Sequence, residues 1–274
     1  MAKKFSKLSL ERICLGVNRY FGAAAASFRH LFLSPLLNRK SANRFCFGVL
    51  SLNDEISYDC PLIKQVEVQE LFPGIEKEVI EVGQVLPWEG SSISAFEVIN
   101  LAAIIQHLKP QRVFEIGTSK GVTAYNLALN LPEGGQLLTL DLPPATEAGA
   151  EISTKFDVTA SDTKMIFADR VNRRFLGTSV ESRITQLYGD SAAFDYSPYE
   201  KSCDVVFVDG SHAYEYVKSD TDSALRIVKS GGWIIWHDYN DGFFWPEVRR
   251  YLKEVSGSMK IYRIKGTMFA IARI

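Results

Sequence analysis

Acidic side chains stand at or near the ends of several short apolar runs, where carboxylates could bind a cation or a polar ligand. These acids are Glu115, Asp141, Asp190, Asp209 and Asp238. The runs themselves are typical of strands buried on both faces of a parallel sheet. Because open α/β sheets bind ligands at the carboxyl ends of their strands, the acids predict a site at one edge for a polar ligand, either cationic or metal-assisted.

Alternating strands and helices would position these acids. Five strands are predicted, at residues 112–117, 136–141, 183–188, 203–209 and 232–238. A first helix begins with the capping box Ser94-Ala-Phe-Glu97 and stops at Pro110. Further helices are predicted at residues 123–131, 162–176, 215–228 and 247–255, and Gly231-Gly232 is interpreted as the end signal of the helix at 215–228.

The end of the chain predicts an antiparallel hairpin, from residues 260–264 and 268–273. With the five runs above, this gives an α/β fold: a Rossmann-like, doubly wound, mostly parallel seven-stranded sheet with a C-terminal antiparallel hairpin. The connection over residues 142–182 is unusually long for such a fold. It is a candidate lid, because functional loops concentrate at this edge of the sheet.

Composition is ordinary for a soluble globular protein, with 46% hydrophobic and 23% charged residues. No apolar stretch approaches the roughly 20 residues that span a bilayer. The four cysteines lack metal-like spacing and no secretory signal accompanies them. These features predict a reduced, cytoplasmic location.

Charge divides the chain more sharply than its net value of −1 suggests. Residues 1–45 carry nine Lys or Arg and one acid, so we expect a basic helical extension there, then a lead-in segment at 46–90 and the main domain at 91–274. The extension could make peripheral contact with an anionic membrane or pack on its own acidic domain. The two interpretations are about equally favoured.

The segment Glu115-Ile-Gly117-Thr-Ser-Lys-Gly121 lies where a strand is expected to turn into a helix. Gly117 would let the backbone approach a ligand, and Gly121 would allow close helix–strand packing. Asp141 follows Gly117 by 24 residues and could accept both hydroxyls of a ribose. A plain strand–helix turn is the alternative. The glycine spacing departs from the pattern of NAD-binding proteins.

These motifs resemble the class I S-adenosylmethionine-dependent methyltransferases, and more narrowly the small-molecule O-methyltransferases of the macrolide and antibiotic-tailoring type. The most specific stretches are Asp209-Gly-Ser-His-Ala-Tyr-Glu-Tyr-Val-Lys-Ser-Asp220 and Gly231-Gly-Trp-Ile-Ile-Trp-His-Asp238. The similarity covers roughly residues 90–274. It implies S-adenosylmethionine as the cofactor, bound by Glu115, Gly117, Thr118, Ser119, Gly121, Asp141, Asp190 and Ser191.

The resemblance also assigns parts to those residues. Glu115 and Gly117 would face the amino-acid end of the cofactor, and Asp141 its ribose. Asp190 would contact the adenine amino group, with Ser191 beside it.

Some members of this group bind a divalent cation through acids at the ends of the fourth and fifth strands, which correspond here to Asp209 and Asp238. His237 stands where relatives carry an acid or amide, a departure that either removes the metal or favours Mn²⁺ over Mg²⁺. His212 lies three residues after Asp209 and could take the proton of a substrate hydroxyl. The predicted metal ligands are therefore Asp209, Asp238 and His237, and the predicted catalytic residues are His212 and Asp209.

The predicted function is O-methylation of a hydroxyl on a small molecule or sugar. We expect no nucleic-acid partner, and either a monomer or a homo-oligomer. Alternatives are a non-catalytic, membrane-associated binding module, a hydroxylase on the same scaffold, and an NAD-dependent oxidoreductase. Trp236, Phe243, Phe244 and Trp245 would either wall an acceptor pocket or belong to the core.

Overall fold

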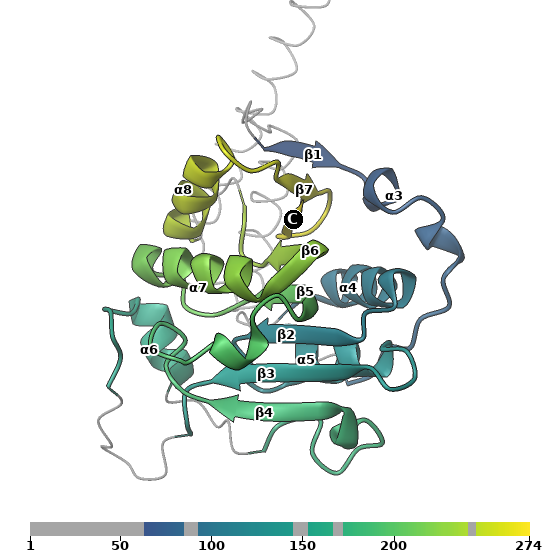
Figure 1. Ribbon diagram of the computed structural model, residues 1–274, viewed down its shortest axis with the longest axis horizontal. Coiled ribbons are helices and arrows are strands. Elements are labelled where there is room, and N and C mark those ends of the chain that lie inside the picture. Colours follow the sequence, from purple (N-terminus) through teal and green to yellow (C-terminus); the bar gives the residue numbers. More distant parts are fainter. Residues whose placement is uncertain (1–62, 85–92, 145–152, 167–171, 241–244) are drawn as a thin grey trace, which may run out of the picture. The chain divides into compact units, whose positions relative to one another are not determined.

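An eight-stranded mixed sheet forms the centre of the computed structural model, which describes residues 63–84, 93–144, 153–166, 172–240 and 245–274. Figure 1 shows the strands stacked across the molecule. Their order is β1 (Lys64–Val66), β7 (Tyr262–Ile264), β8 (Ala270–Arg273), β6 (Val228–Trp236), β5 (Cys203–Val208), β2 (Arg112–Ile116), β3 (Gln136–Asp141) and β4 (Ile184–Tyr188). Only β8 runs antiparallel to its neighbours. The mostly parallel sheet with a C-terminal antiparallel hairpin is thus confirmed.

The number of strands was predicted wrongly, because β1 adds an eighth strand at the edge of the sheet. It comes from the lead-in segment and pairs in parallel with β7. The backbone N–H of Lys265 donates to the Val66 carbonyl at 2.9 Å. A three-residue strand of Lys, Gln and Val has no pattern of its own. Pairing with the backbone of β7, rather than the side chains of β1, therefore specifies this strand.

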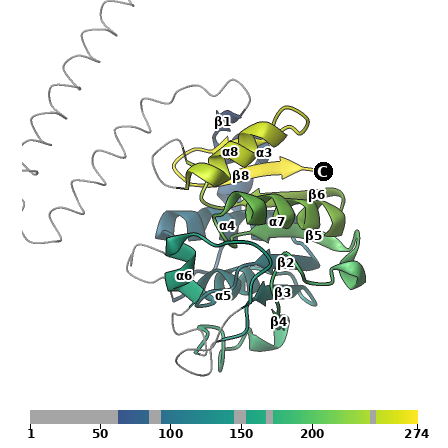
Figure 2. The same cartoon turned by 90° about the vertical axis from the view of Figure 1, so that its left-hand side faces the viewer.

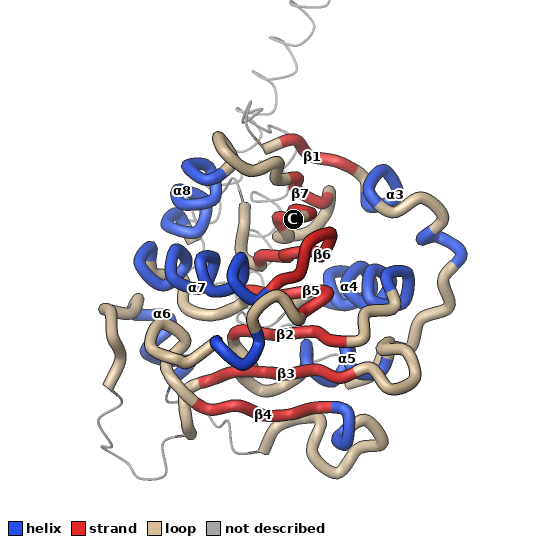
Figure 3. Tube along the Cα trace, in the orientation of Figure 1, coloured by secondary structure: helices blue, strands red, loops and turns tan. Residues whose placement is uncertain are grey.

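Helices cover both faces of the sheet, as a doubly wound fold requires. Along β2, Phe114 and Ile116 join one buried cluster and Val113 joins the other. The first cluster includes residues of α7 (Tyr214–Ile227) and α8 (Pro246–Val255), and the second those of α4 (Ala95–Leu108) and α5 (Val122–Leu129). Alternate residues of a strand point to opposite faces of the sheet, and both faces are buried here, so the strand sequences are nearly continuous apolar runs. Strand and helix alternate along most of the chain (Figure 3).

Short elements complete the described chain: α3 (Val68–Leu71), η2 (Ile75–Lys77), α6 (Ala160–Ile166), η3 (Glu181–Arg183) and η4 (Ser197–Tyr199). Helix α6 lies beyond the ends toward which the arrowheads of β2, β3 and β4 point in Figure 1, and Figure 2 views the molecule from that side. Among the described helices, none has the length and apolar character that crossing a membrane requires. The predicted basic extension at 1–45 lies outside the described residues.

The capping box at the start of α4 is confirmed. The Ser94 hydroxyl accepts from the Glu97 backbone N–H at 3.3 Å, and the Glu97 carboxylate accepts from the Ser94 N–H at 2.9 Å. The helix ends at Leu108, and Lys109 follows in the left-handed conformation. The backbone N–H groups of Ser94 and Glu97 have no partner within the helix, and each donates to the side chain of the other residue.

Two helix ends differ from the sequence prediction. Helix α7 stops at Ile227 and β6 begins at the next residue, so Gly231 and Gly232 do not end the helix. They lie in an irregular stretch of β6, where a Cβ on Gly232 would approach the Asp204 carbonyl oxygen to 2.8 Å. The helix predicted at 162–176 is α6, which ends at Ile166, while residues 173–176 form a turn and 167–171 lie outside the described residues.

Candidate active site

The loop after β2 is as tight as its glycines suggest. Gly117 has a φ of +100°, and a Cβ there would lie 1.9 Å from the Asp209 carbonyl oxygen. Gly121, with a φ of +75°, precedes the first residue of α5, and a Cβ there would meet Phe175 at 2.8 Å. Only glycine fits both the backbone conformation and the space. Gly117 therefore brings the ends of β2 and β5 together.

Glu115 is a fully buried carboxylate at the end of β2. The Thr139 hydroxyl donates to its Oε2 at 2.5 Å, and the Thr139 oxygen lies 2.6 Å from that of Thr118. Oε1 has no hydrogen-bond partner among the described residues. Burial raises the pKa of Glu115 to about 8. At neutral pH the folded protein therefore keeps this carboxyl group mostly protonated, and a positive charge beside it would favour its ionisation.

Asp141 accepts hydrogen bonds from the loop that the resemblance assigns to the cofactor. The backbone N–H of Ser119 donates to Oδ2 at 2.9 Å, and that of Leu142 donates to Oδ1 at 2.8 Å. The guanidinium of Arg173 lies 3.5 Å from Oδ2 and 3.4 Å from the Ser119 carbonyl. Arg173 is buried and was missed by sequence reasoning, because it lies in the long connection without any motif around it.

Asp190 follows β4 and is held by groups from two other parts of the chain. The Tyr216 hydroxyl donates to Oδ1 at 3.0 Å, and the Lys155 backbone N–H donates to Oδ2 at 2.6 Å. Ser191, next to it, is partly exposed. The 142–182 connection therefore contacts two of the predicted cofactor-binding acids: Lys155 contacts Asp190, and Arg173 contacts Asp141.

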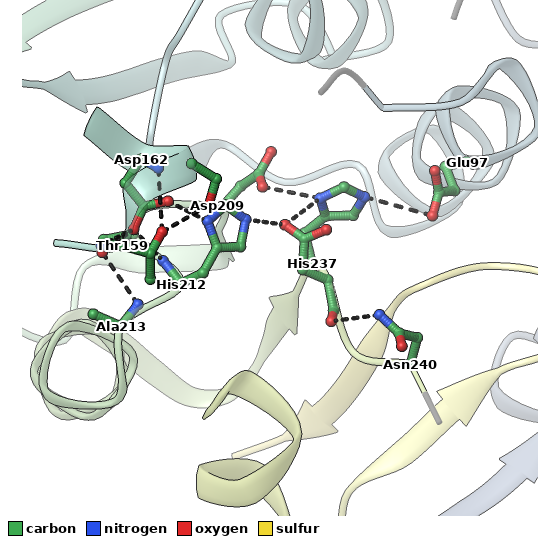
Figure 4. Close-up of polar contacts among 11 residues, drawn as sticks. Glu97, Thr159, Asp162, Asp209, His212, Ala213, His237 and Asn240 are labelled. Carbon is green, nitrogen blue, oxygen red and sulfur yellow. Dashed lines mark hydrogen bonds and ion pairs between the residues drawn. The ribbon is translucent and has the colours of Figure 1, made fainter. Parts of the chain in front are cut away.

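A chain of alternating carboxylates and imidazoles crosses the ends of β5 and β6 (Figure 4). His237 lies at its centre: its Nδ1 is 2.9 Å from Asp209 Oδ1 and 3.3 Å from Asp238 Oδ2, and its Nε2 is 3.5 Å from Glu97 Oε1. Burial alone would lower the pKa of His237, but the carboxylates of Asp238 and Asp209 raise it well above its usual value. Glu97 was predicted only as a helix cap, so its contact with the site was missed.

His212 continues this chain with a carboxylate at each ring nitrogen. Nε2 is 2.8 Å from Asp238 Oδ2, and Nδ1 makes a close contact with Asp162 of α6. The ring stacks on Trp245 with 3.7 Å between centroids. Against the effect of burial, the hydrogen bonds to Asp162 and Asp238 raise the pKa of His212 to about 10. In this arrangement the ring is an imidazolium that donates from both nitrogens.

Asp238 is held in an unusual backbone conformation at the end of β6. Its φ is +62°, which L-residues rarely adopt. It is buried, and the charges of His237 and His212 outweigh burial and keep its pKa below its usual value. Strain of about 1–3 kcal/mol at such a residue is typical of functional sites.

The predicted metal ligands lie close enough to share one ion. One ligand atom from each of Asp209, His237 and Asp238 lies within 4.8 Å of the others. Donors about 2.0–2.2 Å from a common cation lie at most about 4.4 Å apart. The separations of His237 Nδ1 from Asp209 Oδ1 and Asp238 Oδ2, 2.9 Å and 3.3 Å, fall within that limit. A set of two carboxylates and one imidazole suits Mn²⁺ better than Mg²⁺, because Mg²⁺ prefers oxygen ligands alone.

Two of the four aromatic residues that could belong either to an acceptor pocket or to the core lie in different environments. Trp236 is fully buried in the core, and its indole N–H donates to the Thr221 hydroxyl at 2.9 Å. Trp245 lies against His212 and so belongs to the site. Phe243 and Phe244 lie outside the described residues.

Comparison with known proteins supports the family that the sequence resembles. A family model described as a methyltransferase domain matches residues 114–239. That span contains the whole row of acids from Glu115 to Asp238. Over residues 114–239 the chain is therefore similar to methyltransferases. Among curated protein sequences, none matches the chain significantly.

Solved structures of methyltransferases are similar to this chain at low sequence identity. A Podospora anserina methyltransferase bound to S-adenosylhomocysteine has a TM-score of 0.50 and 16% identity, covering 86% of this chain and 96% of its own. An O-methyltransferase of Streptomyces achromogenes involved in tomaymycin synthesis, in complex with S-adenosylmethionine, has a TM-score of 0.47 and 16% identity, covering 80% and 94%. A Bacillus cereus O-methyltransferase in complex with S-adenosylhomocysteine has a TM-score of 0.46 and 17% identity, covering 68% and 83%.

The charge of His212 gives a first prediction. Without metal, His212 should stay an imidazolium from neutral pH up to about 10. Asp162→Asn should move its titration at least one pH unit lower, because an amide replaces one of the two carboxylates. Histidine ¹⁵N chemical shifts in EDTA-treated protein measure this titration. Ser211→Ala is the control, because it removes the 2.7 Å hydrogen bond to Asp162 and the 3.2 Å hydrogen bond from the Ala213 N–H but leaves both carboxylates beside His212. Equal titration in all three proteins would contradict the prediction.

Proposed function

We propose that this chain is an S-adenosylmethionine-dependent O-methyltransferase that acts on a hydroxyl of a small molecule or sugar. The observation that supports it most is the placement of Glu115, Asp141 and Asp190 at the carboxyl ends of β2, β3 and β4, which are neighbours in the sheet. Strands lie about 4.8 Å apart, so the three acids span about 10 Å. An ammonium, a ribose and an adenine amino group along one extended cofactor present donors over a comparable length.

Each of these acids suits its proposed partner. The free Oε1 of Glu115 would accept from the cofactor ammonium, which would also stabilise the ionised carboxylate. Asp141 and Asp190 already accept backbone N–H groups, which keeps their carboxylates fixed for the ribose and the adenine. The loop from Gly117 to Gly121, including Thr118 and Ser119, would pack against the same molecule.

In the proposed reaction the acceptor oxygen attacks the sulfonium methyl group in line, the methyl–sulfur bond breaks, and S-adenosylhomocysteine leaves. Holding the two reactants aligned supplies most of the catalysis. Asp209 and His212 are the groups proposed to lie beside the acceptor hydroxyl. Because both nitrogens of His212 donate in the described arrangement, it can take a proton only after losing its own.

A divalent cation, Mn²⁺ or Mg²⁺, is proposed to bind Asp209, His237 and Asp238. A bound cation would lower the pKa of the acceptor hydroxyl and hold its oxygen. The residues themselves supply the charge that attracts it, since two carboxylates face one imidazole at this point. Peripheral membrane contact through residues 1–45 and a homo-oligomer remain part of the proposal, as does the absence of a nucleic-acid partner.

Isothermal titration calorimetry with S-adenosylhomocysteine tests the cofactor assignment. We expect one bound molecule per chain and, for Asp141→Ala, an affinity lower by about 10- to 100-fold, because charge-assisted hydrogen bonds to the ribose are worth about 1.5–3 kcal/mol. Glu133→Ala, which removes an exposed acid before the same strand, is the control. No binding by the wild-type protein would contradict the proposal. Heat on addition of NAD instead would favour an oxidoreductase.

Metal removal tests the cation. Protein treated with EDTA should unfold at a lower temperature than protein with Mn²⁺, since an ion at 100 times its dissociation constant stabilises the folded state by about 2.7 kcal/mol. Asp238→Asn should abolish this shift, and Asp222→Asn, which changes an exposed acid of α7, should keep it. A wild-type midpoint that does not respond to Mn²⁺ would reject the ion.

A further inference from the structure

Glu97 contacts the site from a different part of the fold than the acids of the sheet edge. It lies in the first turn of α4, and its side chain is 3% exposed. His237 Nε2 is 3.5 Å from its Oε1 and has no hydrogen-bond partner among the described residues. A buried imidazole nitrogen is thus directed at a buried carboxylate 140 positions earlier in the chain.

The opposite nitrogen of the same ring points to the proposed cation site. Nδ1 is 2.9 Å from Asp209 and 3.3 Å from Asp238. A histidine that binds a metal through one nitrogen usually donates its other N–H to a carboxylate, which fixes the tautomer and makes the ring a stronger ligand. Glu97, His237 and the two aspartates have this arrangement.

We propose that Glu97 is the positioning residue of this cation site: it holds the proton of His237 on Nε2 and so leaves Nδ1 as the metal ligand. The inference rests on the cation of the proposed function and extends it to a residue outside the sheet. The proposal also explains why position 237 is a histidine rather than a residue with an oxygen ligand. The imidazole has two nitrogens, so it can face Glu97 of α4 with one and the two aspartates with the other.

Glu97 is well fixed for this task. Oε2 accepts from the Ser94 N–H at 2.9 Å, and Oε1 accepts from the Met268 N–H at 2.8 Å. The first contact joins it to the start of α4, and the second to the turn between β7 and β8. Two backbone donors from separate elements therefore determine where the carboxylate faces His237.

Titration with Mn²⁺, followed through the electron paramagnetic resonance signal of the free ion, tests the proposal in the full-length protein. Glu97→Gln should weaken Mn²⁺ binding by about 10- to 100-fold, the usual effect of removing such a partner. Ser94→Ala is the matched control, because it removes the other half of the capping box without touching His237, and it should change the affinity less than about threefold. Equal affinity in wild-type and Glu97→Gln proteins would overturn the inference.

A double-mutant cycle separates the specific contact from a general loosening of α4. With His237→Asp, which supplies an oxygen ligand in place of the ring, Glu97→Gln should no longer change Mn²⁺ affinity. The same loss in both backgrounds would reject the positioning role. If Glu97→Gln does not fold, ¹⁵N-histidine hyperfine coupling to Mn²⁺ in the wild-type protein decides, since its absence excludes His237 as a ligand. A wild-type protein that binds S-adenosylhomocysteine but not Mn²⁺ overturns the inference while leaving the methyltransferase proposal standing.

Discussion

Gly117→Ala is expected to destabilise the protein by about 3 kcal/mol or more and to abolish binding of S-adenosylhomocysteine. The added Cβ would lie 1.9 Å from the Asp209 carbonyl oxygen, and the backbone φ of +100° is itself strained for alanine. Relief requires the ends of β2 and β5 to separate. Both strand ends carry site acids, so stability and binding should fall together.

Gly74→Ala is the control that distinguishes the cost of the positive φ from the cost of the steric clash with Asp209. Gly74 has a similar φ of +91°, but an added Cβ would meet no atom within 4 Å. Its cost should be about 1 kcal/mol, with cofactor affinity unchanged. Thermal unfolding and calorimetry measure both quantities. Similar losses of stability for the two variants would show that the collision with Asp209 does not exist.

Glu115→Gln is expected to have opposite effects on stability and on cofactor binding. The pKa of Glu115 is raised from 4.5 to about 8 by burial, so the folded protein retains a proton that the unfolded chain releases. Stability therefore falls as pH rises through this interval, by up to about 1.4 kcal/mol for each pH unit. Glutamine has no proton to lose, so the variant should be increasingly more stable than wild type from about pH 5 to pH 8.

Binding of S-adenosylhomocysteine should change in the other direction. At pH 8 the wild-type carboxylate can pair with the cofactor ammonium, and the amide cannot, so we expect an affinity lower by about 10- to 100-fold. Denaturant unfolding between pH 5 and 8, with calorimetry at pH 8, measures both effects. Glu133→Gln, an exposed control, should change neither. A variant that is less stable than wild type at pH 8 would contradict the assignment of the raised pKa.

Local patterns account for most of the architecture. The runs that became β2, β3 and β5 are apolar on both faces because helices cover both sides, so their boundaries could be predicted nearly to the residue. The capping box at Ser94 likewise depends only on residues three positions apart. The edge strand β1 and the end of α7 could not be predicted, because a neighbouring strand's backbone and an irregular pairing of β6 decide them.

The sequence by itself determined which acids meet at the sheet edge, since parallel strands place their carboxyl ends side by side whatever the rest of the chain does. The tertiary structure alone decided what those acids contact. Asp162 reaches His212 from 50 positions away, and Glu97 reaches His237 from 140. No local spacing encodes such contacts. The charge of His212 therefore depends on carboxylates that only the folded chain brings to it, and the charge of His237 depends on Asp209 as well as on its sequence neighbour Asp238.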